Sequence, residues 1–315
     1  MLKKVVVTGG CGFIGSRIVQ QIINKGYEVH IVDNLSTGST KNLDNMTLNN
    51  TYLWEMDILD DRLLSVIKDI NPDYIIHQAA QTSVLKSITD PYKDAEINIL
   101  GSINLIKIAN ELNLKKFIFA STAAIYGDLD KLSITEDDRG ELTSNYGLSK
   151  YTIEKYLELN GKINGLKYCA LRYSNVYGFK QNNLGDIGVI SSFYNALITN
   201  STPYIFGDGE QIRDFVYVDD VAKANILAME SEHTGIYNVS SNKKTTINEA
   251  FNTIKTLMKK NIDPIYSKER EGDIKMSVLS NQKIKEELGW RCTTSFVEGI
   301  NQFINIEKEH KRQYV

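Results

Sequence analysis

Tyr146 and Lys150 lie four positions apart in the segment NYGLSKYTIEKYLELNG (145–161), whose pattern predicts a helix. Residues with this spacing share one face of a helix, so the phenol and the ammonium can point to the same place. A nearby ammonium stabilises a phenolate and lowers the pKa of the tyrosine. Tyr146 could then act as general base towards an alcohol and as general acid towards a ketone. The same spacing also fits an ordinary pair of helical neighbours.

A hydroxyl group stands at the end of a strand-like segment upstream. The segment FIFASTAAIYG (117–127) passes from apolar residues to Ser121 and Thr122. A hydroxyl there could hydrogen-bond the substrate oxygen whose proton Tyr146 exchanges, although a Ser/Thr turn after a strand would look the same. We predict Tyr146, Lys150 and one of these two hydroxyl groups as the catalytic set.

A glycine-rich turn opens the chain. In VVVTGGCGFIGS (5–16), Gly9, Gly12 and Gly15 lie between a β-branched strand and an apolar helix. Glycine allows a tight turn and a close approach of the backbone to a pyrophosphate, and the helix N-terminus favours negative charge. Any tight strand-to-helix turn also favours glycine, so the triplet alone is weak.

The next strands end in residues that suit a dinucleotide. Asp33 ends the second strand, about 20 residues after the turn, where a carboxylate binds the adenosine ribose hydroxyls. Because a carboxylate there repels a 2′-phosphate, NAD is favoured over NADP. The third strand leads to Asp57 and Ile58, where an adenine could lie, and the fourth ends in Ala79 and Ala80. Ligands of open parallel sheets bind at such strand ends.

These residues need a sheet that brings their strand ends together. Apolar strand-like segments occur at 3–9, 27–33, 51–57, 74–80, 115–121 and 167–173, with helical or loop connections between them. This alternation predicts an α/β fold with a doubly wound parallel sheet that is buried on both faces.

The pattern loosens after about residue 173. We expect a loop at 178–188, helices at 189–200, 221–231 and 246–260, strands at 204–206, 214–220 and 235–241, a turn at 207–211 and a final helix after Trp290. The predicted domains are therefore a dinucleotide-binding domain (1–172) and a smaller C-terminal α/β substrate-binding lobe (173–315), with segments of the lobe interleaved with the first domain.

Composition excludes several classes of protein. The net charge of −3 over 315 residues provides no basic field for a nucleic acid. No apolar run approaches the length of a membrane span, and the N-terminus does not resemble a signal peptide. The three cysteines and four histidines are scattered, which predicts no metal site and no disulfide framework. We expect a cytoplasmic protein.

TGGCGFIG, Thr122 and YGLSK together resemble the extended short-chain dehydrogenase/reductase family, and its nucleotide-sugar branch matches along essentially the whole chain. The resemblance implies a Rossmann fold, tightly held NAD, Tyr146 as acid and base, Lys150 on the nicotinamide ribose and Thr122 in the Ser/Thr role. It also implies a UDP-sugar substrate and a homodimer formed through helices near 93–112 and 145–160.

The resemblance extends to many binding positions. The expected cofactor residues are Gly9, Gly12, Phe13, Ile14, Gly15, Asp33, Asn34, Ser36, Thr37, Gly38, Asp57, Ile58, Ala79, Ala80, Gln81, Asn98, Ser121, Tyr146, Lys150, Tyr173 and Val176. The expected substrate residues are Ser83, Val84, Thr122, Asn175, Gly188, Val189, Tyr204, Phe206, Gln211, Arg213, Arg270, Asp273 and Ser277. Within the second set, Arg213 and Arg270 match diphosphate ligands, Asp273 a ribose ligand, and Tyr204 with Phe206 the uracil-binding strand. Taken singly, the charged positions also fit ordinary surface residues.

Three reactions share this architecture in the family: 4-epimerisation, 4,6-dehydration and decarboxylation of UDP-glucuronate. The dehydratases resemble one another in an Asp-Glu pair directly after the threonine, and decarboxylases usually have a Glu there, whereas this chain has Ala123 and Ala124. Two methyl groups cannot transfer protons, so we predict a UDP-sugar 4-epimerase that acts through a 4-keto sugar. A non-catalytic NAD or nucleotide-sugar sensor is the alternative from another class, but it predicts an altered Tyr146 or Lys150.

Ser277 bears on the size of the substrate. It aligns with a position where some epimerases carry a bulky tyrosine. A small side chain there is expected to admit a C2 N-acetyl group, so we predict turnover of UDP-GlcNAc and UDP-GalNAc as well as UDP-glucose and UDP-galactose. A serine that merely packs at a turn would look the same.

Overall fold

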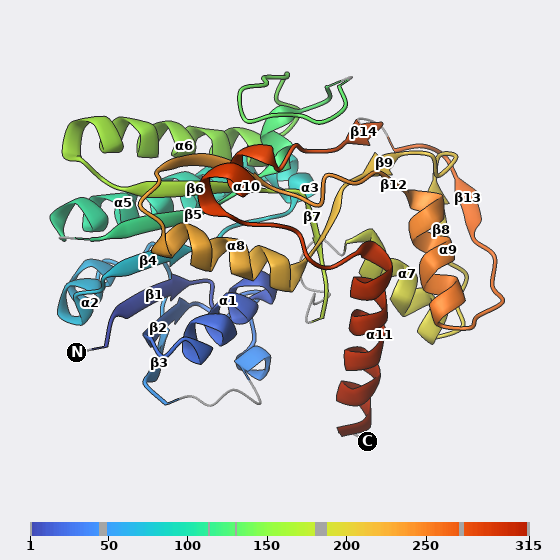
Figure 1. The fold of residues 1–315 in the computed structure, drawn as a ribbon, viewed down its shortest axis with the longest axis horizontal. Helices are drawn as coiled ribbons and strands as arrows, with labels where there is room; N and C mark the ends of the chain where they lie inside the picture. The colour runs from blue at the N-terminus through green and yellow to red at the C-terminus, as the bar shows by residue number, and fades with distance from the viewer. Residues whose placement is uncertain are drawn as a thin grey trace.

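A seven-stranded parallel sheet forms the centre of the molecule (Figure 1). The computed structural model describes residues 2–43, 49–112, 114–129, 131–179, 188–270 and 274–313. Across the sheet the strands follow in the order β11 (Gly235–Val239), β6 (Tyr168–Tyr173), β5 (Lys116–Thr122), β4 (Tyr74–His77), β1 (Lys4–Thr8), β2 (Glu28–Asp33) and β3 (Thr51–Glu55). This order confirms the predicted doubly wound α/β fold.

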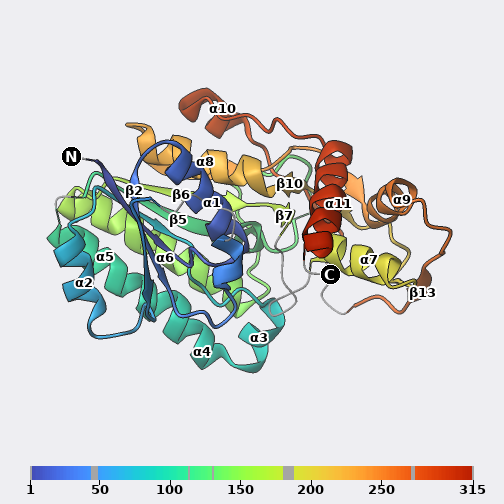
Figure 2. The same cartoon turned by 90° about the horizontal axis from the view of Figure 1, so that it is seen from below.

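Helices cover both faces of the sheet (Figure 2). One face packs against α1 (Phe13–Asn24), α8 (Val218–Glu230) and α10 (Gln282–Leu288). The other packs against α2 (Leu63–Ile70), α5 (Gly101–Glu111) and α6 (Asn145–Asn164). Shorter elements are η1 (Thr40–Leu43), α3 (Val84–Thr89), α4 (Pro91–Ala95), the π-helical η2 (Glu96–Leu100) and η3 (Ala123–Tyr126).

The first strand shows why the sheet is buried on both sides. Successive side chains of a strand point to opposite faces. Val5 and Val7 belong to the core under α1 and α8, whereas Val6 belongs to the core under α2, α5 and α6. All three are fully buried, so the β-branched run fits a central parallel strand.

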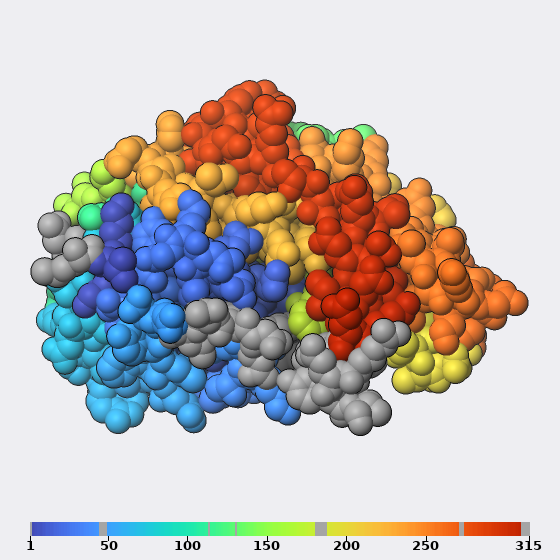
Figure 3. Space-filling view, turned by 60° about the horizontal axis from the view of Figure 1, so that its bottom comes forward, coloured from blue at the N-terminus to red at the C-terminus, as the bar shows by residue number. Residues whose placement is uncertain are grey.

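The remaining elements form a lobe beside one end of the sheet. Its helices are α7 (Val189–Ile198), α9 (Ile247–Leu257) and α11 (Phe296–Gln313), and Figure 3 shows α11 in red between the blue N-terminal half and the orange α9. Three small sheets complete it: β7 (Asn175–Tyr177) with β10 (Phe215–Tyr217), β8 (Tyr204–Phe206) with β13 (Ile265–Ser267), and β9 (Ile212–Arg213) with β12 (Thr245–Thr246) and β14 (Met276–Ser277). Its core is rich in aromatic side chains, including Tyr177, Phe193, Phe215, Phe251 and Phe303.

Several element boundaries differ from the sequence prediction. The strand predicted at 214–220 is only β10, because α8 already begins at Val218 with Asp219 and Asp220 in its first turn, where carboxylates favour a helix. The strand predicted at 51–57 ends at Glu55 and lies at the sheet edge, where it is partly exposed instead of buried on both faces. The helix α10 was not predicted. None of the helices in the described residues is long and apolar enough to cross a membrane.

Candidate active site

The glycine turn connects β1 to α1 at the carboxyl end of the sheet. Gly9 has a φ of +68°, and a Cβ atom on it would lie 2.7 Å from the backbone nitrogen of Ala79. A Cβ on Gly15 would collide with the carbonyl oxygen of Gly9. Gly12 is the N-cap of α1. Because glycine has no side chain, the first backbone N–H groups of the helix receive no hydrogen bond from the N-cap residue's side chain. The turn is therefore a bare backbone cradle of the kind that receives a pyrophosphate.

Asp33 ends β2 beside this turn and is 7% exposed. Its carboxylate accepts hydrogen bonds from the backbone N–H of Cys11 at 2.8 Å and of Leu35 at 2.9 Å. Burial raises the pKa of Asp33, and the two backbone hydrogen bonds oppose the shift. The carboxylate thus ties the glycine turn to the loop after β2, and each oxygen keeps acceptor capacity for a ribose hydroxyl.

The loops after β2 and β3 meet through their side chains. Asn34 Nδ2 donates to Asp57 Oδ2 at 2.6 Å. Ile58 is buried, and its side chain fills the space next to Gly101 at the start of α5. The structure therefore brings together three of the residues predicted for the adenosine end of the cofactor.

The loop after β4 is held by Asn98 from the π-helical turn η2. Asn98 Oδ1 accepts from the N–H of Gln81 at 2.9 Å, and Asn98 Nδ2 donates to the carbonyl oxygen of Gln81 at 2.9 Å. Asn98 also contacts Asp94 and Ser149, the residue before Lys150. A π-helical turn rotates the residues that follow it, and such turns are frequent at functional sites.

Lys150 and Thr122 lie close to the end of β5. Lys150 is 3% exposed, and its Nζ donates to the carbonyl oxygen of Ala120 at 2.9 Å and lies 4.8 Å from the centre of the Phe119 ring. Burial lowers the pKa of Lys150 to about 8, which the charge of Asp94 opposes. Thr122 ends β5, and its Oγ1 accepts from the N–H of Ala124 at 3.1 Å.

Tyr146 lies in the first turn of α6 and is half-buried. Ser144 caps this helix by accepting from the N–H of Gly147 at 3.1 Å, which fixes the position of the first turn. The predicted helix over 145–161 is confirmed, and Tyr146 and Lys150 lie one turn apart on it.

Tyr173 lies at the end of β6, and its strand register places it opposite Thr122. Its hydroxyl contacts Asn225 Oδ1 at 3.0 Å and accepts from Gln78 Nε2 at 3.0 Å. Burial raises the pKa of Tyr173, and its hydrogen bonds with Gln78 and Asn225 oppose the shift. Asn225 and Gln78 were missed by sequence reasoning, because their contacts with Tyr173 join residues far apart in the chain.

One group of predicted substrate residues gathers around β8. The guanidinium carbon of Arg270 lies 4.0 Å from the centre of the Phe206 ring, and Gln211 Nε2 donates to the carbonyl oxygen of Phe206 at 2.7 Å. Gln211 Oε1 is buried without a hydrogen-bond partner among the described residues. Tyr204 on the same strand is 58% exposed. A stacked ring and a buried acceptor next to an arginine suit a flat polar ligand with an anionic group.

A second group surrounds Arg213 on β9. Ser277 on β14 is its register partner, so the two residues lie side by side. Asp214 follows, and its carbonyl oxygen accepts from the N–H of Asn175 at 2.9 Å, which connects this group to the strand after Tyr173. The Asp214 carboxylate is fully buried, accepts from backbone N–H groups including that of Ser241, and has its pKa raised by burial to about 6. Sequence reasoning did not identify Asp214 as an anchor.

The other predicted positions are distributed around these groups. Ser83 is the N-cap of α3, Val84 is its first residue and is partly exposed, Gly188 is the N-cap of α7, and Val189 begins that helix. Phe13 and Ile14 begin α1 and pack against the lobe core, as does Val176. Ser36, Thr37 and Gly38 follow Asp33 in the same loop. Asp273 lies outside the described residues.

The fold and the site are those of a dinucleotide-binding protein. Its glycine turn follows β1, Thr122 ends β5, and Tyr146 and Lys150 lie near the start of α6. Residues 5–240 match the NAD dependent epimerase/dehydratase family. The chain belongs to this family, which confirms the resemblance inferred from the sequence and NAD as the cofactor.

Three of the proteins that are similar to this chain over nearly its whole length are UDP-sugar 4-epimerases. The chain is 32% identical to a UDP-glucose 4-epimerase of Mycolicibacterium smegmatis, covering 94% of this chain and 96% of that protein. It is similar to the crystal structure of a UDP-glucose 4-epimerase from Thermotoga maritima with UDP-glucose, with a TM-score of 0.93, 40% identity and 98% and 99% of the two chains covered. A UDP-N-acetylglucosamine 4-epimerase from Methanobrevibacter ruminantium in complex with UDP-N-acetylmuramic acid has a TM-score of 0.94 and 38% identity, with the same coverage.

Proposed function

We propose that this protein is an NAD-dependent UDP-sugar 4-epimerase. The observation that carries the proposal is the make-up of the segment after β5. Thr122 is followed in η3 by Ala123 and Ala124, so this segment offers one hydroxyl and no carboxylate to a substrate. Elimination of water from a sugar needs an additional acid and base, whereas epimerisation at C4 needs only one group that takes up and returns a proton. Relatives described as UDP-glucose 4-epimerases support this choice.

The residues at the strand ends fit NAD. The turn formed by Gly9, Gly12 and Gly15 would receive the pyrophosphate, because the absence of side chains lets its backbone pack tightly and approach the phosphates closely; a Cβ at Gly9 or Gly15 would collide with backbone atoms of the turn or of Ala79. Asp33 would bind the adenosine ribose, and Lys150 would bind the nicotinamide ribose. When bound, NAD supplies a hydride acceptor and donor at C4 of the sugar.

The protein residues supply proton transfer and orientation. Tyr146 takes the proton of the C4 hydroxyl and later returns it to the C4 oxygen, after the 4-keto sugar has presented its opposite face for reduction at C4. Lys150, held as a buried ammonium, favours the phenolate form of Tyr146 through its charge. Thr122 orients the C4 oxygen by a hydrogen bond. Between the two proton transfers the sugar must turn about its diphosphate linkage so that its other face is presented.

The lobe binds the UDP part of the substrate in this proposal. Arg213 and Arg270 bind the diphosphate, since a guanidinium forms paired hydrogen bonds with phosphate oxygens. The β8 strand from Tyr204 to Phe206 presents its edge to the uracil, and Asp273 binds the ribose. A ligand anchored at its nucleotide end leaves the sugar free to turn, which the reaction needs.

We further propose that the sugar pocket admits an N-acetyl group at C2. Ser277 is half-buried next to Arg213, so its small side chain lies beside a predicted diphosphate ligand. The predicted substrates are therefore UDP-GlcNAc and UDP-GalNAc in addition to UDP-glucose and UDP-galactose. The likeness to the M. ruminantium enzyme supports this breadth.

A homodimer is the proposed assembly. The helical layer formed by α3, α4, η2 and α6 exposes large apolar side chains: Leu85, Ile88, Tyr92, Leu100, Leu148, Leu159 and Ile163. The elements pack together in one layer (Figure 2). Exposed apolar groups in one area are typical of an interface between protein chains, and a second copy would bury the same surface on both partners.

The test of the function is direct. Purified protein is incubated with UDP-glucose or UDP-GlcNAc without added NAD, and the products are identified by NMR. The proposal predicts the C4 epimer of each substrate. A 4-keto-6-deoxy sugar would indicate a dehydratase, and no product with NAD bound would favour a sensor. A parallel incubation with UDP-glucuronate tests the remaining reaction, because loss of CO2 from it would indicate a decarboxylase.

A further inference from the structure

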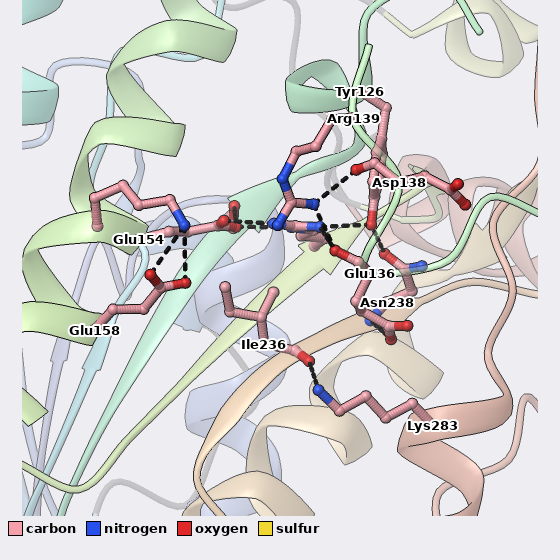
Figure 4. Close-up of polar contacts among 12 residues, drawn as sticks. Tyr126, Glu136, Asp138, Arg139, Glu154, Glu158, Ile236, Asn238 and Lys283 are labelled. Carbon is pink, nitrogen blue, oxygen red and sulfur yellow. Dashed lines mark hydrogen bonds and ion pairs between the residues drawn. The ribbon is translucent and has the colours of Figure 1, made fainter.

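A fully buried ion pair joins α6 to β6, and Figure 4 shows its Glu154 together with the surrounding Tyr126, Glu136 and Asn238. The side chains of Arg172 on β6 and Glu154 on α6 are both 0% exposed. The pair is bidentate, with Arg172 Nε at 2.9 Å from Glu154 Oε1 and Arg172 Nη2 at 2.7 Å from Glu154 Oε2. Such geometry fixes the relative position of the two elements as well as neutralising both charges.

The pair contacts both ends of the segment that carries Thr122. Ser121 Oγ donates to Glu154 Oε1 at 2.6 Å, and Arg172 Nη1 donates to the hydroxyl of Tyr126 at 2.8 Å. Ser121 precedes Thr122, and Tyr126 ends η3, so the ion pair holds the segment Ser121–Tyr126 at its first and last residue. The hydroxyl of Ser121 is thereby directed towards Glu154.

The same pair joins the elements that carry the other predicted catalytic groups. Glu154 follows Lys150 by one turn of α6, and Arg172 directly precedes Tyr173 on β6. Ser121 and Arg172 are also register partners in the sheet. α6, β5 and β6 therefore meet at one bidentate contact.

Further hydrogen bonds connect the ion pair to β11 and to Glu136. Tyr126 donates from its hydroxyl to Asn238 Oδ1 at 2.6 Å, and Asn238 on β11 donates from its backbone N–H to Glu136 Oε1 at 2.7 Å. Arg172 Nη1 also donates to the carbonyl oxygen of Glu136 at 2.9 Å. All three nitrogens of the guanidinium thus donate to protein acceptors, and the arginine has no freedom to turn towards a ligand.

A buried ion pair is a weak source of stability, because the cost of removing two charges from water is comparable to their attraction. Its geometry can still matter for function, because catalytic groups need to be held within a fraction of an ångström of the productive arrangement. The pair lies at the point where such a constraint would act on Thr122, Tyr146 and Lys150.

We propose that Arg172 and Glu154 are positioning residues of this enzyme, which hold the segment Ser121–Tyr126 in register with α6 so that Thr122 and Tyr146 face the same substrate oxygen. The proposal rests on the proposed function for its catalytic consequence. Its structural half, the fixed register of that segment, holds independently of the reaction.

Two variants test it. Glu154→Gln removes the charge and keeps the shape, but it leaves Arg172 buried without a counter-charge and can unfold the protein. The double variant Glu154→Leu with Arg172→Met replaces the pair by apolar side chains of similar volume, which removes the burial cost of the charges. The matched control is Glu158→Gln on the same helix, because Glu158 pairs with Lys155 at the surface, with side chains 31% and 40% exposed.

The kinetic readout separates positioning from stability. For the double variant we expect a thermal unfolding temperature near that of the wild type and a kcat lower by about 100-fold, the usual size of a misplacement effect, with KM little changed. The control should keep the kcat of the wild type. A double variant that folds and has the kcat of the wild type would overturn the proposal.

A second readout does not depend on the reaction. Amide hydrogen exchange of the segment Ser121–Tyr126 should become at least about ten-fold faster in the double variant, while β1 keeps its protection, because a local constraint is lost without global unfolding. Unchanged exchange in this segment, or an equal increase in β1, would also reject positioning. If the wild-type protein epimerises no UDP-sugar, the proposed function fails, and the exchange measurement still decides whether the pair fixes the segment.

Discussion

At the scale of single residues, Lys150 combines a positive charge with almost complete burial. Its ammonium has one backbone acceptor, the carbonyl oxygen of Ala120, and an aromatic face at Phe119. Burial lowers the pKa of Lys150 to about 8 from its ordinary value of 10.5, so the charge that Tyr146 needs is lost only slightly above neutral pH. The residue that we propose to support catalysis is therefore also one whose burial costs stability.

Activity should fall as the pH rises through about 8, because deprotonated Lys150 no longer stabilises the Tyr146 phenolate. Stability should change in the opposite direction. Unfolding takes up a proton between pH 8 and 10.5, so the contribution of this group to stability increases with pH in that window. A pH profile of kcat, together with thermal unfolding over the same range, measures both effects.

The variant Lys150→Met provides the control for that profile. It should lose most of its activity and the alkaline fall, and at neutral pH it should unfold at a higher temperature than the wild type, because no charge is buried. A wild-type profile that stays flat from pH 7 to well above the pKa of about 8 would be incompatible with this role of Lys150.

We predict that Ser277 determines which size of sugar the proposed pocket admits. Ser277→Tyr should abolish turnover of UDP-GlcNAc and leave turnover of UDP-glucose within a few-fold, because an added ring excludes the N-acetyl group and not the smaller hydroxyl. Separate kcat/KM values for the two substrates test this. An equal loss for both would show that the tyrosine merely distorts β14.

Residue identity could be predicted from the sequence where the chemistry is local. Tyr146 and Lys150 stand four positions apart in one short segment, and Gly9, Gly12 and Gly15 stand three positions apart in another. The structure places the first pair on α6 and the glycines at the β1–α1 turn. Glu154 and Arg172 could not be found in this way, since their bidentate contact joins a helix and a strand whose register only the sheet determines. Asp214 and Asn225 were missed for the same reason.

At the scale of elements, the β1–α1 turn depends on Gly9 and Gly15 because their Cβ positions are occupied by backbone atoms. Gly9→Ala should cost stability through its positive φ and also weaken NAD binding by displacing the loop at Ala79. The measurement is the NAD content of the purified protein, together with its unfolding temperature.

Gly26 offers the matched control at the other end of α1. It also has a positive φ, of +79°, but a Cβ there would meet no atom within 4 Å. Gly26→Ala should therefore lower the unfolding temperature while NAD content stays normal. Normal NAD content in Gly9→Ala as well would contradict the assignment of this turn to the pyrophosphate.

The alternation of strands and helices could be predicted because each central strand is apolar on both faces. The pairing of strands that lie far apart in the sequence could not be predicted. β11 follows β6 by about sixty residues and still completes the sheet next to it, and β8 pairs with β13 although α8 and α9 lie between them in the chain. Short strands of two or three residues carry too little pattern to indicate their partners.

At the scale of the whole molecule, the exposed apolar layer on α3, α4, η2 and α6 leads to a prediction about assembly. Leu159→Asp combined with Ile163→Asp should convert a dimer to a monomer, because two carboxylates would be buried at the interface; the two side chains are 52% and 69% exposed in the single chain. Sedimentation velocity measures the change. A monomeric wild-type protein, or a double variant that still forms dimers, would place the interface elsewhere or exclude it.

The central claim is that the chain interconverts the C4 epimers of a UDP-sugar with NAD that it already holds. The most direct measurement is NMR analysis of UDP-glucose and UDP-GlcNAc after incubation with the purified protein, without added cofactor, next to Tyr146→Phe. The account predicts UDP-galactose and UDP-GalNAc with the wild type, and turnover at least about 100-fold lower with Tyr146→Phe although NAD remains bound. A 4-keto-6-deoxy product, or epimerisation that is unaffected in Tyr146→Phe, would contradict it.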